Sequence, residues 1–206
     1  MCERRLTGVA VLTLLVSVAA YGDPVIDGVW SSATRSKGGL GSQWVFTKNG
    51  TTTYSFGALV DFTYEIDGEH IHMILLNEFG VPTDNVTVQK FSAKDDTITI
   101  YREESGEDRI MERVGRSNPD SHPIVGVWTF THFTGGPAIL RYRKSGRGQL
   151  SVPFEYKTGI YQVNGDEISI FLDDIDPYRN KIDISQDTIT FAAEDSSTAQ
   201  TYVRLE

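Results

Sequence analysis

Apolar and polar residues alternate along most of the chain in short runs that turn residues separate. Because residues two apart lie on the same side of a strand, such runs predict β-strands with one buried face. The strands predicted in the first half are 28–33, 43–48, 51–57, 60–66, 69–76, 85–92, 96–102 and 108–114. Those predicted in the second half are 126–132, 138–144, 148–154, 158–163, 167–172, 180–185, 187–193 and 199–205. The pattern therefore predicts an all-β protein with eight strands in each half.

The two halves match each other in order and in residue type, as two homologous copies would. The matching segments are 25–30 with 123–128, 64–71 with 161–168, and 96–100 with 187–191. The second copy is six residues shorter between the last two of these segments. We expect two tandem, small, eight-stranded antiparallel barrels, from residues 23–115 and 123–206, joined by a polar linker over 116–122.

The N-terminus has the pattern of a secretion signal. Arg4 and Arg5 precede an apolar run over residues 6–20, so we expect a cleaved signal peptide over residues 1–22. The run is shorter than the ~20 residues that span a bilayer, and no membrane insertion is expected after cleavage. The single cysteine, Cys2, would leave with the signal. A secreted chain without disulfides is typical of a bacterial secreted or periplasmic protein.

The net charge of the chain limits the classes of partner that we expect. Asp and Glu number 28 against 19 Lys and Arg, which gives a formal net charge of −9. Nucleic-acid affinity comes mainly from basic side chains that release counterions, so no nucleic-acid partner is expected. A small apolar ligand or a protein remains as the expected partner.

Each copy opens with a Gly-x-Trp triplet and closes with an arginine on an inward-facing position. The triplets hold Gly28 with Trp30 and Gly126 with Trp128, and the arginines are Arg113 and Arg204. A charge that points into a barrel is costly unless it is paired or stacked, and an indole ring can supply the stack. Because the first and last strands of a closed barrel are neighbours, we expect Arg113 to lie over Trp30 and Arg204 over Trp128.

This repeated combination resembles the lipocalin-like, or calycin, families. The resemblance implies an eight-stranded barrel that often binds an apolar ligand at its open end. The Gly-rich segments 38–41 and 135–137 fall where those families carry their entrance loop. Each copy is shorter than a full lipocalin and lacks the second family motif and the C-terminal helix.

Four inward-facing tyrosines are the expected ligand contacts. They are Tyr54 and Tyr64 in the first barrel and Tyr142 and Tyr161 in the second. A tyrosine ring offers apolar area while its hydroxyl needs a polar partner, which suits the mouth of a barrel. The alternative is that these residues are ordinary core, because small barrels are usually packed full.

Two clusters have metal-ligating residue types. His70 and His72 share one face of a strand, and the expected Asp67-Gly68 turn pairs Glu65 with His70, so both imidazoles point outward without an identifiable third ligand. Three carboxylates, Asp173, Asp174 and Asp176, lack the glycine and glutamate of a calcium loop, and a solvated turn is expected. We therefore expect no metal and no cofactor.

The sequence leaves three classes of function open. The first is a non-enzymatic secreted or periplasmic protein that binds a small apolar or amphipathic ligand. The second is an interaction or inhibitor module that contacts a protein through the barrel loops. The third is a calycin-type enzyme, although the chain has no G-x-S-x-G motif and no cysteine nucleophile beyond the signal. We expect no catalytic residues.

Overall fold

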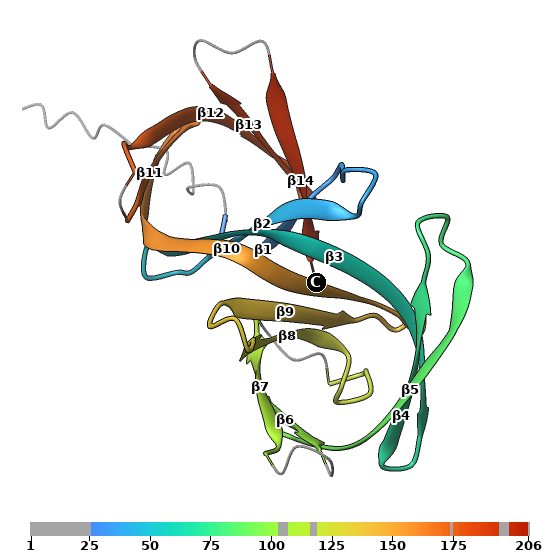
Figure 1. Ribbon diagram of the computed structural model, residues 1–206. Coiled ribbons are helices and arrows are strands. Elements are labelled where there is room, and N and C mark those ends of the chain that lie inside the picture. Colours follow the sequence, from blue (N-terminus) through green and yellow to red (C-terminus); the bar gives the residue numbers. More distant parts are fainter. Residues whose placement is uncertain (1–25, 103–106, 116–118, 174, 194–197, 206) are drawn as a thin grey trace, which may run out of the picture.

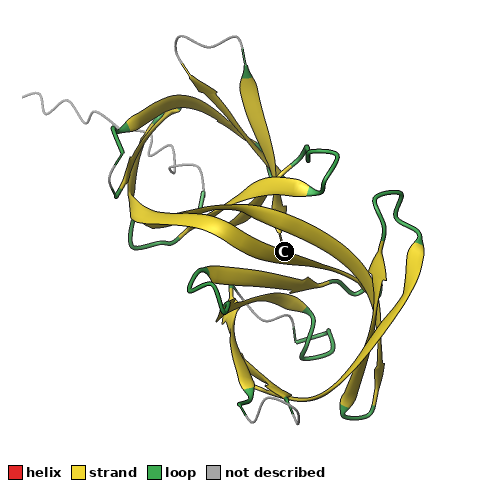
Figure 2. Cartoon of the chain, viewed as in Figure 1, coloured by secondary structure: helices red, strands yellow, loops and turns green. Residues whose placement is uncertain are grey.

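The computed structural model describes residues 26–102, 107–115, 119–173, 175–193 and 198–205. The described residues form fourteen antiparallel strands and no helix, which confirms the all-β prediction (Figure 2). Within these residues there is accordingly no helix long and apolar enough to cross a membrane. The expected signal peptide lies outside the described residues.

Each copy supplies seven of the strands. The first copy forms β1 (Gly28–Ser32), β2 (Leu40–Phe46), β3 (Thr51–Asp67), β4 (His70–Leu76), β5 (Pro82–Lys94), β6 (Thr97–Tyr101) and β7 (Arg109–Val114). The second copy forms β8 (Gly126–Thr131), β9 (Pro137–Tyr142), β10 (Arg147–Asn164), β11 (Glu167–Leu172), β12 (Tyr178–Ile184), β13 (Thr188–Ala193) and β14 (Ala199–Leu205). The prediction of eight strands per copy is wrong, because in each copy two consecutive predicted strands form one continuous strand. These long strands are β3 and β10.

The strands follow one another around a closed ring, and β1 pairs with β14 to complete it. β3 and β10 also pair with each other, from Thr51 with Ile160 to Thr63 with Arg147. This extra pairing divides the large ring into two smaller ones that share the β3–β10 ribbon (Figure 1).

Each smaller ring contains eight strands. The ring that we call the Trp128 ring consists of β4 to β9, the second half of β3 and the first half of β10. The ring that we call the Trp30 ring consists of β11 to β14, β1, β2, the first half of β3 and the second half of β10. Each ring therefore takes strands from both copies.

The expectation that each copy closes its own barrel is wrong. Strands of the first copy hydrogen-bond into the sheet of the second at three places: β1 with β14, β3 with β10, and β7 with β8 across the expected linker. The cause is that β3 and β10 each run on as one uninterrupted strand. Because β3 continues past Gly57 instead of turning back, the strands on either side of this residue enter different rings.

Gly57 allows the two long strands to pair closely. A Cβ atom at this position would lie 1.9 Å from the carbonyl oxygen of Val152 on β10, so any side chain would force the backbones apart. Gly57 pairs with Pro153, and the register then shifts so that Glu155 pairs with Phe56. Phe154 is the extra residue of this β-bulge, which accounts for β10 having 18 residues and β3 having 17.

Each ring has its own apolar core. The Trp128 ring encloses Phe62, Tyr64, Ile71, Phe91, Ile98, Ile100, Met111, Ile124, Trp128, Phe130, Ala138, Leu140 and Tyr142. The Trp30 ring encloses Ile26, Trp30, Trp44, Phe46, Ile168, Ile170, Leu172, Ile182, Ile189, Phe191 and Tyr202. A third cluster, formed by Val29, Val127, Ile139 and Leu205, comes from β1, β14, β8 and β9 and joins the outer faces of the two rings.

Candidate functional site

One end of each ring is closed by an arginine stacked on a tryptophan. The guanidinium carbon of Arg113 lies 4.1 Å from the ring centroid of Trp128, and that of Arg204 lies 4.1 Å from the ring centroid of Trp30. The predicted partners are therefore exchanged. β7 is the neighbour of β8, and β14 is the neighbour of β1, so each arginine meets the tryptophan of the other copy.

Hydrogen bonds hold each stack at the chain segment that precedes its tryptophan. Arg113 donates from Nη1 to the Val125 carbonyl at 3.0 Å and from Nη2 to the Pro123 carbonyl at 2.8 Å. Arg204 donates from Nη1 to the Asp27 carbonyl at 2.6 Å. Both indoles are fully buried, and each donates to the carbonyl four residues earlier at 2.8 Å.

The glycine of each triplet has a backbone conformation that suits glycine, and Gly126 also makes room for Arg113. Gly28 and Gly126 have φ angles of 135° and 143°, which L-residues with side chains rarely adopt. A Cβ atom on Gly126 would lie 2.4 Å from Nη1 of Arg113. The triplet and the arginine thus form one structural cap, in which each guanidinium group stacks on an indole and donates hydrogen bonds to backbone carbonyls.

The four tyrosines are regrouped in the same way as the arginines. Tyr64 and Tyr142 lie together in the Trp128 ring, with ring centroids 4.9 Å apart. Tyr54 and Tyr161 lie in the Trp30 ring, where Tyr54 contacts Trp44 and Tyr161 contacts Phe46. Their role as ligand contacts stays a prediction.

Two of these hydroxyls tie the copies together. Tyr64 donates to the carbonyl of Arg143 at 2.7 Å, and Tyr161 donates to the carbonyl of Thr47 at 2.9 Å. Burial raises the pKa of the Tyr54, Tyr64, Tyr142 and Tyr161 hydroxyls above the ordinary tyrosine value, so all four are protonated at neutral pH.

Aromatic side chains fill the inside of both rings. Trp44 packs on Phe46 and Tyr54, and Phe62 packs edge-on against Tyr142. A barrel of eight strands has room for its side chains or for one small ligand. In this protein aromatic side chains of the described residues pack against one another in that interior.

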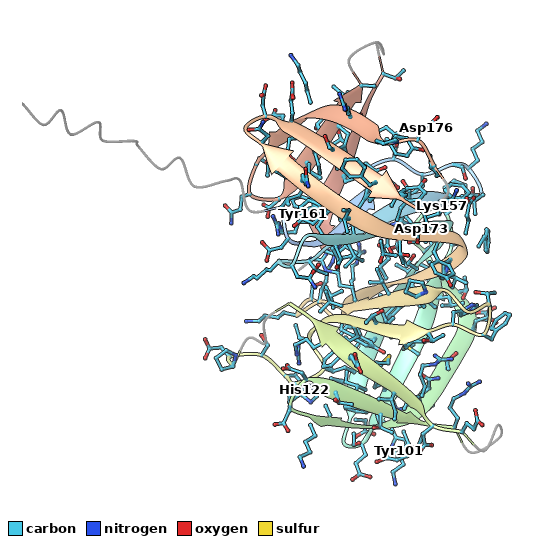
Figure 3. The ribbon with its side chains drawn as sticks, turned by 90° about the vertical axis from the view of Figure 1, so that its left-hand side faces the viewer. Tyr101, His122, Lys157, Tyr161, Asp173 and Asp176 are labelled. Atoms are coloured by element: carbon cyan, nitrogen blue, oxygen red, sulfur yellow. The ribbon has the colours of Figure 1, made fainter. Side chains whose placement is uncertain are left out.

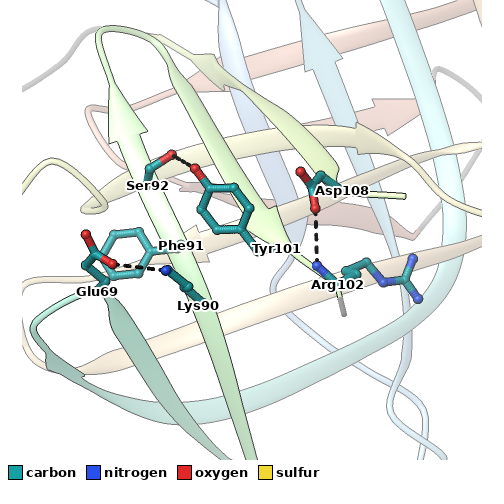
Figure 4. A pocket seen from close by; sticks show the side chains of 7 residues that line it. All are labelled: Glu69, Lys90, Phe91, Ser92, Tyr101, Arg102 and Asp108. Atoms are coloured by element: carbon teal, nitrogen blue, oxygen red, sulfur yellow. Dashed lines mark hydrogen bonds and ion pairs between the residues drawn. The ribbon is translucent and has the colours of Figure 1, made fainter. Parts of the chain in front are cut away.

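A cleft of about 580 Å³ opens on the outside of the Trp128 ring (Figure 4). Its lining residues are Glu69, Lys90, Phe91, Ser92, Tyr101, Arg102 and Asp108. Lys90 lies 3.3 Å from a Glu69 carboxylate oxygen, and the hydroxyls of Ser92 and Tyr101 are 3.1 Å apart. Several polar groups of the cleft therefore pair with each other. A smaller cleft of about 240 Å³ lies beside the Arg113 cap.

The most distinctive surface feature is a hairpin of the first copy, which we call the arm: residues 72–89 of β4, β5 and their connecting turn. β5 has 13 residues, whereas the corresponding strand of the second copy, β12, has 7. Figure 1 shows the turn of the arm standing away from both rings. The six-residue length difference in the sequence was the available signal, although length alone does not reveal a projecting hairpin.

Apolar side chains on the arm are exposed to solvent. Phe79 is 80% exposed, Val86 is 58% exposed and Val88 is 53% exposed. The turn that carries Phe79 is ordered by Asn77, whose Oδ1 accepts hydrogen bonds from the backbone of Phe79 and Val81, each at 3.0 Å. Phe79 is thus held outward by a defined turn.

The residues of metal-ligating type are dispersed over the two rings. Figure 3 shows His122 on one ring, and Asp173 and Asp176 on the other. The described residues contain no group of three or more His, Cys, Asp or Glu that could hold a metal ion, and Asp174 lies outside them. His72, and not His70, pairs with Glu65, because the tight turn lies at Gly68 and Glu69.

Comparison of the chain with known protein families, with curated proteins and with solved structures found no match.

Proposed function

We propose that this chain is a non-enzymatic, secreted binding protein that engages another protein through the arm. The exposed apolar side chains of the arm carry the proposal. Apolar side chains exposed on a projecting hairpin offer a contact surface for a protein partner. The copies are otherwise alike in their caps and cores, so the arm is an addition that ring closure does not require.

The lumen of a lipocalin-like barrel is the competing site, with Tyr54, Tyr64, Tyr142 and Tyr161 as its contacts. Packing argues against this alternative. Two of the four tyrosine hydroxyls already donate to backbone carbonyls, and tyrosine side chains pack on neighbouring aromatic side chains. Secretion is supported by the basic and apolar N-terminal pattern.

Site-specific photo-crosslinking tests the proposal. A photoreactive phenylalanine analogue is placed at Phe79 and the protein is expressed in the organism that makes it. Phe133 is the matched control, because it is 93% exposed in a hydrogen-bonded turn of the second copy. We expect one protein to be crosslinked from Phe79 and not from Phe133.

The crosslinked protein is then purified and its binding to the parent chain is measured. Phe79→Ala should weaken that binding at least about tenfold, as loss of an aromatic anchor does. Equal crosslinking from both positions would contradict the role of the arm. A small molecule found by native mass spectrometry, with no arm-dependent protein partner, would favour the lumen instead.

A further inference from the structure

The edge of the arm that faces away from β4, which we call the open edge, has no paired strand among the described residues. β5 pairs with β4 between residues 82 and 90, but it pairs with β6 only from Lys90 to Lys94. β6 ends at Tyr101, and the N–H of Arg102 donates to Asp108 instead of continuing along β5. Within the described residues, the segment 83–89 therefore has a strand on one side only.

The direction of the free backbone groups follows from one hydrogen bond. The N–H of Phe91 donates to the carbonyl of Glu69, on the β4 side of the strand. In an antiparallel pair, successive residues direct their N–H and C=O groups to opposite edges. Val86 and Val88 therefore direct theirs to the open edge, and Thr87 directs its groups to β4.

The chemistry of this edge fits an added strand. Exposed edges are commonly blocked by lysine or proline, whereas the segment 83–89 contains neither. Val86 pairs with Ile74 of β4 and Val88 pairs with His72 of β4, so these four residues lie on the same face of the hairpin. Two exposed valines at alternate positions beside free backbone groups are the features that bind an extended peptide.

The charge of the surroundings defines the partner further. Residues 71–89 carry Glu78 and Asp84 and no lysine or arginine, and the whole chain has a net charge of −9. A basic segment would be attracted to this surface, whereas a second copy of the chain would be repelled. We propose that the partner contributes an extended segment of alternating apolar and basic residues, which adds as a strand to β5 in line with β6. This inference rests on the proposed function.

The probe is a capped synthetic peptide of alternating lysine and valine, long enough to span residues 83–89. We expect saturable chemical-shift changes in the full chain that are centred on Val86 and Val88. Amide exchange at these two residues should slow at least about tenfold, whereas Thr87 is already bonded to β4 and should change less. A peptide with glutamate in place of lysine should not bind. Shift changes confined to the cleft of Lys90 and Arg102 would overturn the inference.

Backbone substitutions separate strand addition from simple apolar contact. Val86→Pro removes an N–H that faces the partner and spares the β4 ladder, so we expect about tenfold weaker binding. Val86→Ala keeps that N–H and should lose less. Should Val86→Pro perturb the fold, peptides that are N-methylated at every second residue give the same test. Methylation of the residues whose N–H groups face β5 should abolish binding, whereas methylation of the residues between them should not.

The outcomes for the two proposals are distinguishable. If the protein crosslinked from Phe79 binds Val86→Pro and Val86→Ala equally well, strand addition is wrong and the protein-binding function stands. If neither that protein nor the peptide depends on the arm, both proposals fail. A dimer of the free chain with Val86 and Val88 protected would show that a second copy occupies the edge, which contradicts the basic partner.

Discussion

In both copies an arginine closes a ring over a tryptophan at 4.1 Å, and a tyrosine hydroxyl reaches a turn carbonyl of the opposite copy. In β5 and β12, by contrast, the copies differ by six residues, and those residues extend an exposed hairpin. The shared contacts close and join the rings. The unshared hairpin contributes little to either core, and this contrast locates the candidate binding surface.

Disrupting the close pairing of β3 and β10 at Gly57 should give the largest effect on stability. Gly57→Ala places a Cβ atom 1.9 Å from the Val152 carbonyl oxygen, and the strands must separate to accept it. We expect a loss of about 3 kcal/mol in the free energy of unfolding, measured by denaturant titration. Gly38→Ala is the control, because its nearest neighbour would be 3.9 Å away. Equal denaturation midpoints for the two variants would contradict the close pairing of β3 and β10 at Gly57.

The caps should give the next largest effect and should behave alike. Arg113→Ala and Arg204→Ala each remove a stack and leave carbonyls unpaired, so we expect each to cost about 1 to 3 kcal/mol. The indole N–H resonance of Trp128 should shift in the first variant and that of Trp30 in the second. A shift of Trp30 in Arg113→Ala would instead support rings closed within each copy.

A smaller effect on the free energy of unfolding should appear at high pH, and it should come from Tyr142 in the Trp128 ring. Tyr142 corresponds to Phe46 in the other copy, and burial raises the pKa of the Tyr142 hydroxyl above its value in the unfolded chain. The unfolded state then releases its proton first, so stability falls as the pH rises above about 10. Tyr142→Phe should reduce this loss and cost under about 1 kcal/mol at neutral pH, where only the weak bond to the Met73 sulfur is lost. Unfolding measured from pH 8 to 11 checks this, and an unchanged slope would refute it.

The strands and the inward-facing aromatics could be predicted because alternation is a local property. Trp44, Phe46 and Tyr64 are buried as their spacing indicates, and the triplet tryptophans do meet arginines. The choice of partner could not be predicted, since two similar copies offer each tryptophan two equivalent arginines. The continuation of β3 was missed because Gly57 suggests a break, whereas in the structure it permits close strand contact.

The open edge of the arm was missed for a related reason. Val86 and Val88 are ordinary strand residues by type, and among the described residues β5 has no neighbour on its outer edge beyond the pairing of Lys90 with Tyr101, where β6 ends. Sequence alternation reports which face of a strand is apolar. It does not report how far the neighbouring strand extends.

Disulfide trapping tests most directly the central claim that strands from both copies form each ring. Thr53 on β3 faces Thr158 on β10. In a Cys2→Ser background, the double variant Thr53→Cys and Thr158→Cys should form an intramolecular disulfide under mild oxidation and should stay folded. Each single-cysteine variant should keep one free thiol that reacts with a maleimide. Two free thiols that react with a maleimide in the folded, oxidised double variant would contradict the exchange of strands.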